Sequence, residues 1–278
     1  MRFRIILLTA LVFFTGACSF PSKLGGTKKG GEYDVFLLIG QSNMAGRGVL
    51  EESDTLPMDG VWLLKEDGSI TPASEPLNRY STIRKKVGMQ QFNLGDSFAR
   101  AIHKKTGRKV LLVVNARGGS SMEHWLKGAA QRSFNKKEGD DPERIGQPIP
   151  VFYDETLRRT REALRYGTLK AILWHQGESN SSEAKRVRYL GQLASFVGDL
   201  RRDLGLGDIP FIAGELNYAR RSSPEFNAML QNIGKVIPKA WCASAEGCGS
   251  NPDNTHFNRQ GLVLLGERYA EIVLKQAY

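Results

Sequence analysis

Residues 34–48 read DVFLLIGQSNMAGRG and join an apolar run directly to a glycine-rich loop. Residues 35–39 are too few for a typical helix and are β-branched, Leu or Phe, which predicts a strand buried on both faces. Gly40, Gly46 and Gly48 allow a sharp turn after it. Ser42 is therefore the first candidate nucleophile. An ordinary strand-to-helix turn, in which Ser or Asn caps the next helix, is the alternative explanation of this segment.

A second segment, NPDNTHFNRQG at residues 251–261, supplies an acid and a base. Asp253 and His256 are three residues apart, just before an amphipathic helix expected to begin near Asn258. A carboxylate at 253 can accept from Nδ1 of the imidazole and leave Nε2 free to act as a base toward a serine. The alternative is a surface turn in which Asp253 caps the helix.

Two further loops follow apolar runs in the middle of the chain. Residues 110–114 lead into NARGGSS, and residues 171–174 lead into HQGESN. Loops that follow parallel strands converge at the carboxyl edge of a sheet, where open α/β folds place their sites. Gly118 and Gly119 can present backbone N–H groups to a developing oxyanion, and the side chain of Gln176 can add another donor. Each loop is also explained by a plain turn or a loop-bracing amide.

Together these segments resemble the SGNH hydrolases, and within them the sialate O-acetylesterase and acetylxylan esterase branch, carbohydrate esterase family six. The resemblance rests on GQSNMAGRG (40–48), NARGGSS (115–121), WHQGESN (174–180) and DNTHF (253–257). It implies that Ser42 is the nucleophile, His256 the general base and acid, and Asp253 its orienting carboxylate. It also implies an oxyanion hole formed by the Ser42 amide, Gly119 and Gln176, with Gly118 as the alternative to Gly119.

The sequence departs from the wider superfamily at two of these positions. Gln176 stands where the superfamily has Asn, as in this branch, and Asn180 stands where the branch commonly has Asp. Glu178 remains nearby and is either solvated or paired with a cation such as Arg47 or Arg117. The residues expected to support the site from behind are Gln41, Asn43, Gly118 and Glu178.

The amino terminus has the pattern of an export signal. MRFR is basic, residues 5–14 are apolar, and Thr15, Gly16 and Ala17 precede Cys18. The apolar run is shorter than the roughly 20 residues needed to cross a bilayer. The small residues before Cys18 resemble a bacterial lipoprotein cleavage site, with plain cleavage as the alternative. We therefore predict a signal peptide at 1–17, a flexible tether at 18–31 and an esterase domain at 32–278, exported to the cell envelope, the periplasm or the medium.

The remaining cysteines and the histidines point away from a metal site. Cys242 and Cys248 could close a small disulfide loop in an oxidising compartment. The chain has no Cys-x-x-Cys motif, and its four histidines lack ligand spacing. We therefore expect no metal and no cofactor. The histidines are His103, His124, His175 and His256.

The chain carries 39 basic and 29 acidic residues, for a net charge of +10. The basic residues occur as short runs on different elements, without interleaved aromatic residues, so they do not indicate a nucleic-acid partner. They indicate a solvated basic face, with attraction to acidic glycans as a secondary possibility. No motif specifies an oligomeric state. The runs include residues 84–86, 104–105, 158–159 and 220–221.

Strand and helix patterns alternate along the chain, which predicts one α/β domain with a mainly parallel sheet in a three-layer sandwich, as in flavodoxin-like folds. Further strands are expected near 110–114, 171–174, 211–213 and 240–245. Helical faces are expected at 190–200 and 226–237. Residues 51–91 and 127–150 are long, polar and irregular, so we expect them to form rims that select the substrate.

These patterns together predict an exported serine esterase that removes O-acetyl groups from carbohydrate through an acetyl-enzyme on Ser42. The expected partner is an acetylated polysaccharide or oligosaccharide of the acetylxylan type, and a sialate O-acetylesterase is the alternative. Membrane contact is expected only through a lipid on Cys18. A non-catalytic glycan-binding envelope lipoprotein is the alternative from another class. The complete Ser42, Asp253 and His256 set argues against it, because a binding module needs none of the three for chemistry.

Overall fold

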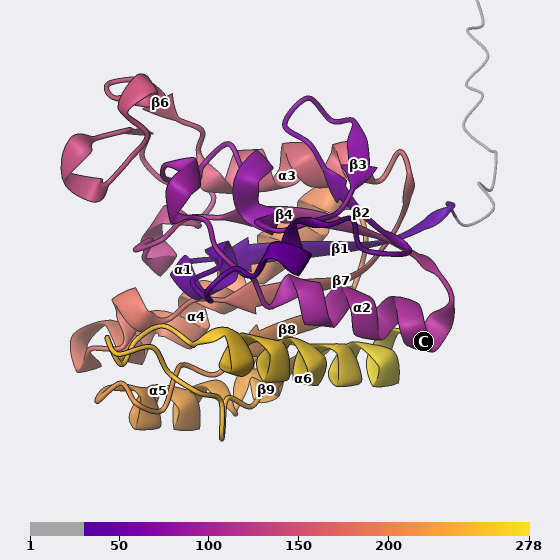
Figure 1. The fold of residues 1–278 in the computed structure, drawn as a ribbon. Helices are drawn as coiled ribbons and strands as arrows, with labels where there is room; N and C mark the ends of the chain where they lie inside the picture. The colour runs from indigo at the N-terminus through magenta and orange to yellow at the C-terminus, as the bar shows by residue number, and fades with distance from the viewer. Residues whose placement is uncertain (1–30) are drawn as a thin grey trace, which may run out of the picture.

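The structure is a computed structural model that describes residues 31–278. Its main sheet has seven strands in the order β3-β2-β4-β1-β7-β8-β9, and every neighbouring pair except β2 and β3 is parallel. The predicted α/β fold with a mainly parallel sheet is thereby confirmed (Figure 1). The strands of this sheet are β1 (Tyr33–Gly40), β2 (Val61–Leu64), β3 (Ile70–Pro72), β4 (Lys109–Ala116), β7 (Gly167–His175), β8 (Phe211–Gly214) and β9 (Ala240–Ala243).

The central strand, β1, is buried along its length between β4 and β7. Val35, Leu37 and Ile39 point into one hydrophobic cluster, and Phe36 and Leu38 point into the other. Successive side chains of a strand lie on opposite faces, so a strand covered on both sides needs an unbroken apolar run. This explains why β1 shows no alternation of polar and apolar residues.

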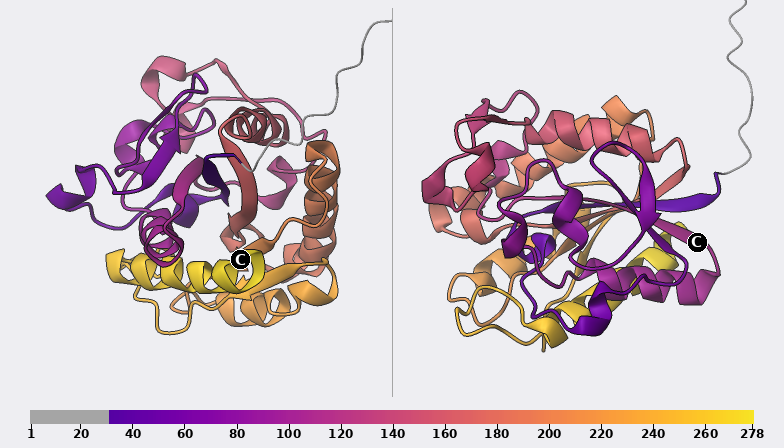
Figure 2. Two further views of the ribbon diagram at one scale, coloured as in Figure 1. Left: turned by 90° about the vertical axis from the view of Figure 1, so that its right-hand side faces the viewer. Right: turned by 45° about the horizontal axis from the view of Figure 1, so that its top comes forward.

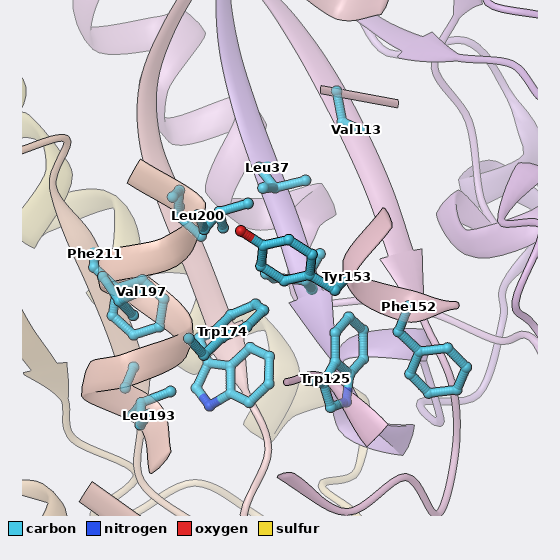
Figure 3. Close-up of a cluster of buried hydrophobic side chains, with 14 of the residues drawn as sticks. Leu37, Val113, Trp125, Phe152, Tyr153, Trp174, Leu193, Val197, Leu200 and Phe211 are labelled. Carbon is cyan, nitrogen blue, oxygen red and sulfur yellow. The ribbon is translucent and has the colours of Figure 1, made fainter. Parts of the chain in front are cut away.

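Helices cover both faces of the sheet, as the views in Figures 1 and 2 show. Side chains from α3, α4 and α5 enter the cluster of Val35 and Leu37, whereas α2 and α6 pack on the side of Phe36 and against each other. In the first cluster the rings of Trp125 and Trp174 meet edge to face, 5.3 Å apart (Figure 3). The helices are α1 (Ser42–Ala45), α2 (Gly95–Thr106), α3 (Phe152–Ala163), α4 (Glu183–Leu204), α5 (Ser223–Leu230) and α6 (Arg259–Ala277).

The carboxyl ends of the parallel strands lie on the left in Figure 1, where α1 follows β1. At the end of β1 the backbone of Gly40 approaches β7 so closely that a Cβ atom would lie 2.1 Å from the carbonyl oxygen of His175, and its φ is +144°. Only glycine fits this contact. The close approach places the loop that starts at Gln41 directly beside the loop that starts at Gln176.

The two long polar segments hold more regular structure than the sequence suggested. Residues 51–91 contain β2 and β3, which extend the main sheet, because Val61 and Leu63 find apolar neighbours beside β4. Residues 127–150 contain the two-stranded β5 (Arg132–Ser133) and β6 (Pro148–Ile149), seen at the upper left of Figure 1. The single helical face expected over 226–237 is instead α5 followed by a short 3₁₀ turn, Ile233–Lys235.

The possible disulfide between Cys242 and Cys248 is not formed in the structure, where both cysteines are free. Cys242 lies on β9 and packs against the cluster that contains Val35, whereas Cys248 packs against the cluster on the opposite face of the sheet. The sheet therefore separates the two thiols. Burial raises the pKa of each thiol, which makes both poor nucleophiles.

No helix within residues 31–278 is long and apolar enough to cross a membrane. The predicted signal peptide, Cys18 and nearly all of the tether lie outside the described residues.

Candidate active site

Ser42, His256 and Asp253 form a chain of hydrogen-bonded side chains. Oγ of Ser42 lies 2.9 Å from Nε2 of His256, and Nδ1 of His256 lies 2.5 Å from Oδ2 of Asp253. The contact between Ser42 and His256 joins residues 214 positions apart in the chain, whereas Asp253 and His256 lie in one turn. Ser42 and His256 line a pocket of about 320 Å³ together with Gly118, Gly119 and Glu178. The structure thus brings together all four loops that the sequence predicted to converge.

Ser42 is held by the end of the central strand. It is the first residue of the short helix α1 and is 5% exposed. The preceding residue, Gln41, donates its backbone N–H to the carbonyl of His175 at 2.9 Å, and its carbonyl accepts from Ala45. These bonds fix the loop on both sides of Ser42, so its hydroxyl is directed at His256 by the core of the protein.

The Asp253–His256 turn is held by bonds within itself. Oδ1 of Asp253 accepts from the backbone N–H groups of Thr255 and His256, each at 2.9 Å. Its second carboxylate oxygen is thereby aimed at the imidazole. The cap of α6 is Asn258, whose Oδ1 accepts from the N–H of Gly261 at 2.8 Å. The alternative in which Asp253 caps this helix is therefore wrong.

Asn43 links the turn to the strand side of the pocket. Its Oδ1 accepts from the N–H of Phe257 at 3.1 Å, and its Nδ2 donates to the carbonyl of Thr255 at 3.3 Å. The same Nδ2 donates to Oε1 of Glu178 at 2.6 Å. Asn43 is fully buried and directly follows Ser42, and its two partners in the turn, Thr255 and Phe257, flank His256. This one amide therefore fixes the distance between Ser42 and His256.

The carboxyl group of Asp253 is ionised at neutral pH. Partial burial raises its pKa, but the backbone and side-chain hydrogen bonds from His256 and the backbone bond from Thr255 outweigh that effect, and the pKa is lowered to about 2. Its side chain is 51% exposed and that of His256 is 23% exposed. An ionised acceptor at Nδ1 selects the tautomer whose Nε2 is free to accept the proton of Ser42.

Free backbone donors surround Ser42. Among residues 31–278, the N–H groups of Gly118 and Gly119 donate to no protein acceptor, although both residues line the pocket. A Cβ atom on Gly118 would lie 3.6 Å from Cβ of Ser42, and Gly119 has a φ of +74°. Either amide is available for an oxyanion, so the alternative between the two glycines stays open.

Gln176 is completely buried and lies behind the pocket. Its Nε2 approaches three acceptors, at 3.1 Å (Oε1 of Gln41), 3.2 Å (the carbonyl of Ser120) and 2.8 Å (Oδ1 of Asn180). An amide nitrogen carries two hydrogens, so at most two of these three acceptors receive a linear hydrogen bond from it at one time. Gln41 lines the pocket, so the hydrogen bond from Gln176 holds a pocket residue in position.

Asn180 takes part in the same network. Its Oδ1 accepts from Gln176 and from the N–H of Met122 at 2.8 Å, and its Nδ2 lies 3.3 Å from Oε2 of Glu123. An ionised Asp at this position could accept from Gln176 and Met122 but could not donate to Glu123. Asn in place of the usual Asp thus supplies a donor to the carboxylate of Glu123 and avoids repulsion between two carboxylates.

Glu178 has a different partner from those expected. Arg47 donates to the carbonyls of Gly46 and Met89, and Arg117 binds carboxylates elsewhere, so neither pairs with Glu178. Glu178 is 6% exposed, which also excludes the solvated alternative. Burial raises its pKa to about 7, against the opposing bonds from its own backbone and from Asn43. Its second oxygen, Oε2, is buried without a partner in the described part of the chain.

The two long polar segments contribute unequally to the pocket. Lys85 and Met89, from residues 51–91, line it, whereas residues 127–150 do not. That second segment holds Arg117, which forms ion pairs with Asp140 at 2.7 Å and Glu138 at 2.8 Å. Its effect on the site is therefore indirect.

Sequence reasoning missed two cationic residues of the pocket, Lys85 and Arg220. Both belong to the short basic runs interpreted as a solvated face, and only the fold shows which member of each run points inward. It also missed Asn217, whose Nδ2 donates to the carbonyl of His256 at 3.2 Å. The other histidines lie outside this hydrogen-bonded chain of side chains. His175 is buried, and that burial lowers its pKa to about 3. Within residues 31–278 no cluster of His, Cys, Asp and Glu is arranged to hold a metal ion.

A mainly parallel α/β sandwich with this loop arrangement at its carboxyl edge defines an SGNH-like esterase fold. The chain belongs to the family described as carbohydrate esterase, sialic acid-specific acetylesterase, whose model matches residues 32–275.

Known proteins agree with this assignment. A protein described as a probable carbohydrate esterase from Arabidopsis thaliana is 26% identical over 263 residues, which cover 88% of this chain and 89% of the relative. An X-ray structure of an Arabidopsis thaliana protein has a TM-score of 0.74 at 23% identity and covers 89% of this chain and 100% of its own. The crystal structure of NanS has a TM-score of 0.63 at 16% identity, with 88% and 98% coverage. A carbohydrate acetylesterase from Xanthomonas citri has a TM-score of 0.62 at 18% identity and covers 88% of this chain and 57% of its own. The three structures support the fold.

Proposed function

We propose that the protein is an exported serine esterase that hydrolyses O-acetyl groups on carbohydrate through an acetyl-enzyme on Ser42. The observation that carries the proposal is the pair of contacts from Ser42 to His256 and from His256 to Asp253, in a pocket lined by free backbone donors. A serine hydroxyl becomes nucleophilic when a base is hydrogen-bonded to it and a third group orients that base.

In the first half of the reaction, Nε2 of His256 accepts the proton of Ser42 as Oγ attacks the acetyl carbonyl. The negative charge that develops on the carbonyl oxygen is stabilised by the Ser42 amide and by Gly119 or Gly118, with Gln176 as the third proposed donor. The C–O bond to the sugar then breaks, and the imidazolium gives its proton to the departing sugar oxygen.

In the second half, water replaces the sugar. His256 accepts a proton from that water, whose oxygen attacks the acetyl-enzyme, and acetate leaves as Ser42 recovers its proton. Asp253 stays ionised throughout, because its pKa of about 2 lies far below neutral pH. No step requires a group other than these side chains, the backbone donors and water.

The proposal covers two sugars, an acetylated xylan and an acetylated sialic acid, of which the family match favours the second. The non-catalytic alternative leaves the two short contacts around His256 without a purpose. The direct test is to quench the protein during turnover of a small aryl acetate and to search by mass spectrometry for acetylation of Ser42. Acetate release from acetylated xylan and from 9-O-acetyl sialic acid is compared in parallel. Rapid turnover with no acetyl group on Ser42 would contradict the mechanism.

We also propose that the chain is exported and lipid-anchored at Cys18, on the basis of the sequence pattern of residues 1–18. A lipidated protein should fractionate with membranes and partition into detergent. Cys18→Ser should block this processing and change both size and location. A single acyl chain binds membranes only marginally, so firm anchoring needs the several chains of a bacterial lipoprotein. Recovery of a soluble wild-type protein that begins at or after Ser19 would contradict the anchor and leave ordinary secretion.

A further inference from the structure

Strand β4 continues beyond the end of its neighbour β2 in the sheet. The last pair of these two strands is Leu63 with Leu112, whereas β4 runs on to Ala116 beside β1. Successive N–H groups of a strand point to opposite edges, and the N–H of Arg117 donates to the carbonyl of Gly40 in β1 at 3.0 Å. The N–H and the carbonyl of Ala116 therefore face the edge that β2 no longer covers.

The side chain of Asn78 takes the place of a strand at that edge. Its Oδ1 accepts from the N–H of Ala116 at 3.0 Å, and its Nδ2 donates to the carbonyl of Ala116 at 2.9 Å. Nδ2 also donates to Oε1 of Gln90 at 2.7 Å. Asn78 is completely buried and Gln90 is nearly so, which shields these bonds from water. Because a side-chain amide offers the same donor and acceptor as a peptide unit, Asn78 extends the hydrogen bonding of the sheet by one residue.

The turn that holds the glycine pair follows this edge directly. The carbonyl of Arg117 accepts from the backbone N–H of Ser120 at 3.3 Å and from its Oγ at 2.9 Å. Gly118 and Gly119 are therefore the two central residues of a tight turn, and within residues 31–278 their own N–H groups donate to no protein acceptor. The position of both glycine amides thus depends on where the backbone of residues 116 and 117 is fixed.

Other contacts from the segment of Asn78 reach the end of β4 through its side chains. Oγ of Ser81 donates to Oδ1 of Asn115 at 2.8 Å, and Nη1 of Arg117 donates to the carbonyl of Ile83 at 3.0 Å. Asn78 differs from them because it bonds to the main chain on both sides of one peptide residue. It is therefore the contact in this group that fixes the path of the backbone into the turn.

We propose that Asn78 is a positioning residue, which holds the Gly118–Gly119 turn where a glycine amide can stabilise the oxyanion beside Ser42. The inference rests on the proposed esterase function and deepens it, because it names the side chain that keeps the backbone donors in place. A Cβ atom on Gly118 would lie 3.6 Å from Cβ of Ser42, so the turn and the nucleophile are in near contact. A displacement of about 1 Å in such a site can cost on the order of 10²-fold in rate.

The test replaces Asn78 with leucine, which has a similar size and no polar atom. Asn78→Leu leaves the N–H and the carbonyl of Ala116 without this partner. We expect kcat/KM for an aryl acetate to fall about 10- to 100-fold, because the glycine amides no longer lie where the oxyanion forms. The melting temperature should fall as well, so rates are expressed per folded molecule.

A sulfur-substituted ester separates the positioning of oxyanion donors from a general loss of structure. In an O-aryl thionoacetate, sulfur replaces the carbonyl oxygen and accepts weaker hydrogen bonds, so the oxyanion donors contribute less to its turnover. The wild type should prefer the oxygen ester, and Asn78→Leu should reduce that preference in kcat/KM by about tenfold. A purely structural role would slow both esters equally. An unchanged ratio of the two esters in every folded Asn78 variant would overturn the inference.

Ser81→Ala is the matched control. It removes a buried hydrogen bond between the same two segments, but one that ends on the side chain of Asn115. It should lower the melting temperature and keep the wild-type ratio of the two esters. If it changed the ratio as much as Asn78→Leu does, the role assigned to Asn78 would be wrong.

A milder variant serves if Asn78→Leu does not fold. The carboxylate introduced by Asn78→Asp can still accept from the N–H of Ala116 but cannot donate to its carbonyl. The preference for the oxygen ester should then fall in the same direction by a smaller factor than in Asn78→Leu.

Amide NMR keeps the inference testable if the protein hydrolyses neither ester. The backbone amide resonances of Gly118 and Gly119 are compared in the full mature wild-type protein and in its Asn78→Leu, Asn78→Asp and Ser81→Ala variants. We expect both resonances to move in the Asn78 variants and to stay in place in Ser81→Ala. Displaced glycine resonances without any turnover would count against the esterase function and leave the role of Asn78 in holding the turn. Unmoved glycine resonances in a folded Asn78 variant would overturn that role.

Discussion

The two sides of the pocket are built in different ways. On the strand side, which comprises Ser42, Asn43, Gln176 and Glu178, each residue is at most 6% exposed and is held by the ends of β1 and β7. On the turn side, residues 251–258, the Asp253 side chain is 51% exposed and His256 is 23% exposed. The groups proposed to attack and to stabilise the oxyanion are thus fixed by the core, and those that move protons lie near solvent.

The difference indicates how each side keeps its geometry. The strand side is preorganised by packing and by a buried amide network, which gives donors their full electrostatic effect. The turn side relies on the two backbone bonds to Asp253 and on anchors from Asn43 and Asn217. Mutations on the strand side, apart from the Ser42 hydroxyl that bonds to His256, should therefore affect stability as well as rate, and mutations on the turn side should chiefly affect the rate.

The largest effect is expected for Ser42→Ala. Its Oγ is the only side-chain atom proposed to form a covalent bond, and loss of a triad nucleophile costs on the order of 10⁶ in kcat. The hydroxyl bonds to His256 and not to the core, so the fold should be retained. Turnover of an aryl acetate and the melting temperature are measured on one preparation. A folded variant with activity near that of the wild type would exclude Ser42 as the nucleophile.

The next largest effect is expected for Asp253→Asn on the turn side. The new amide can keep the backbone bonds through its oxygen but must present N–H to Nδ1 of His256, which moves the imidazole proton to Nε2 and removes the base. Such a change lowers the rate by about 10⁴ in other triads. Because Asp253 is half exposed, stability should change little. A loss below about threefold in kcat would mean that another group orients His256.

The strand side could be predicted from sequence because its determinants are local. An unbroken apolar run followed by GQSN specifies a buried strand and a tight turn, and such a strand delivers Ser42 to the sheet edge. The same holds for the loops after β4 and β7. The spacing of Asp253 and His256 likewise predicted their contact, which the structure shows at 2.5 Å.

The long-range polar contacts could not be predicted. Asn43 was expected only to support the site, and nothing local indicates that it binds Thr255 and Phe257, more than 200 residues away. The predicted partners of Glu178, Arg47 and Arg117, were wrong for the same reason. The actual partner depends on which side chains the order of the strands places beside Glu178. Likewise Lys85 and Lys86 are adjacent residues of the same type, so the sequence does not distinguish them. Only the path of the loop makes Lys85 a pocket residue.

Gln176→Ala tests whether the strand side couples rate to stability. If Gln176 donates to the oxyanion, kcat should fall about 10² to 10³ with little change in KM. The variant also leaves the acceptors on Gln41, Ser120 and Asn180 without this donor, which should cost about 1–3 kcal/mol of unfolding free energy. Kinetics and denaturation on one preparation separate the effects. A lower melting temperature with normal kcat per folded molecule would make Gln176 a bracing residue only.

The smallest effect on the rate is expected for Glu178→Gln, and its main effect should be on how the free energy of unfolding depends on pH. The folded-state pKa of Glu178 is about 7, whereas an unfolded Glu titrates near 4.3. Between these values the folded protein keeps a proton that the unfolded chain has lost. Stability in the wild type should therefore fall as the pH rises from about 4.3 to 7 and level off above it, by up to about 4 kcal/mol from this group.

The isosteric amide in Glu178→Gln can still accept from Asn43 through its oxygen but does not titrate. Urea denaturation from pH 4.5 to 8 should show that the variant gains stability relative to the wild type as the pH rises, with no further gain above pH 7. Glu123→Gln is the control, because the pKa of Glu123 is lowered to about 2, so its contribution is lost only below about pH 4.3 and should give no slope in this range. A Glu178→Gln difference that stays constant across this range would show that Glu178 is ionised in the folded protein throughout, and that the strand side is more hydrated than its burial indicates.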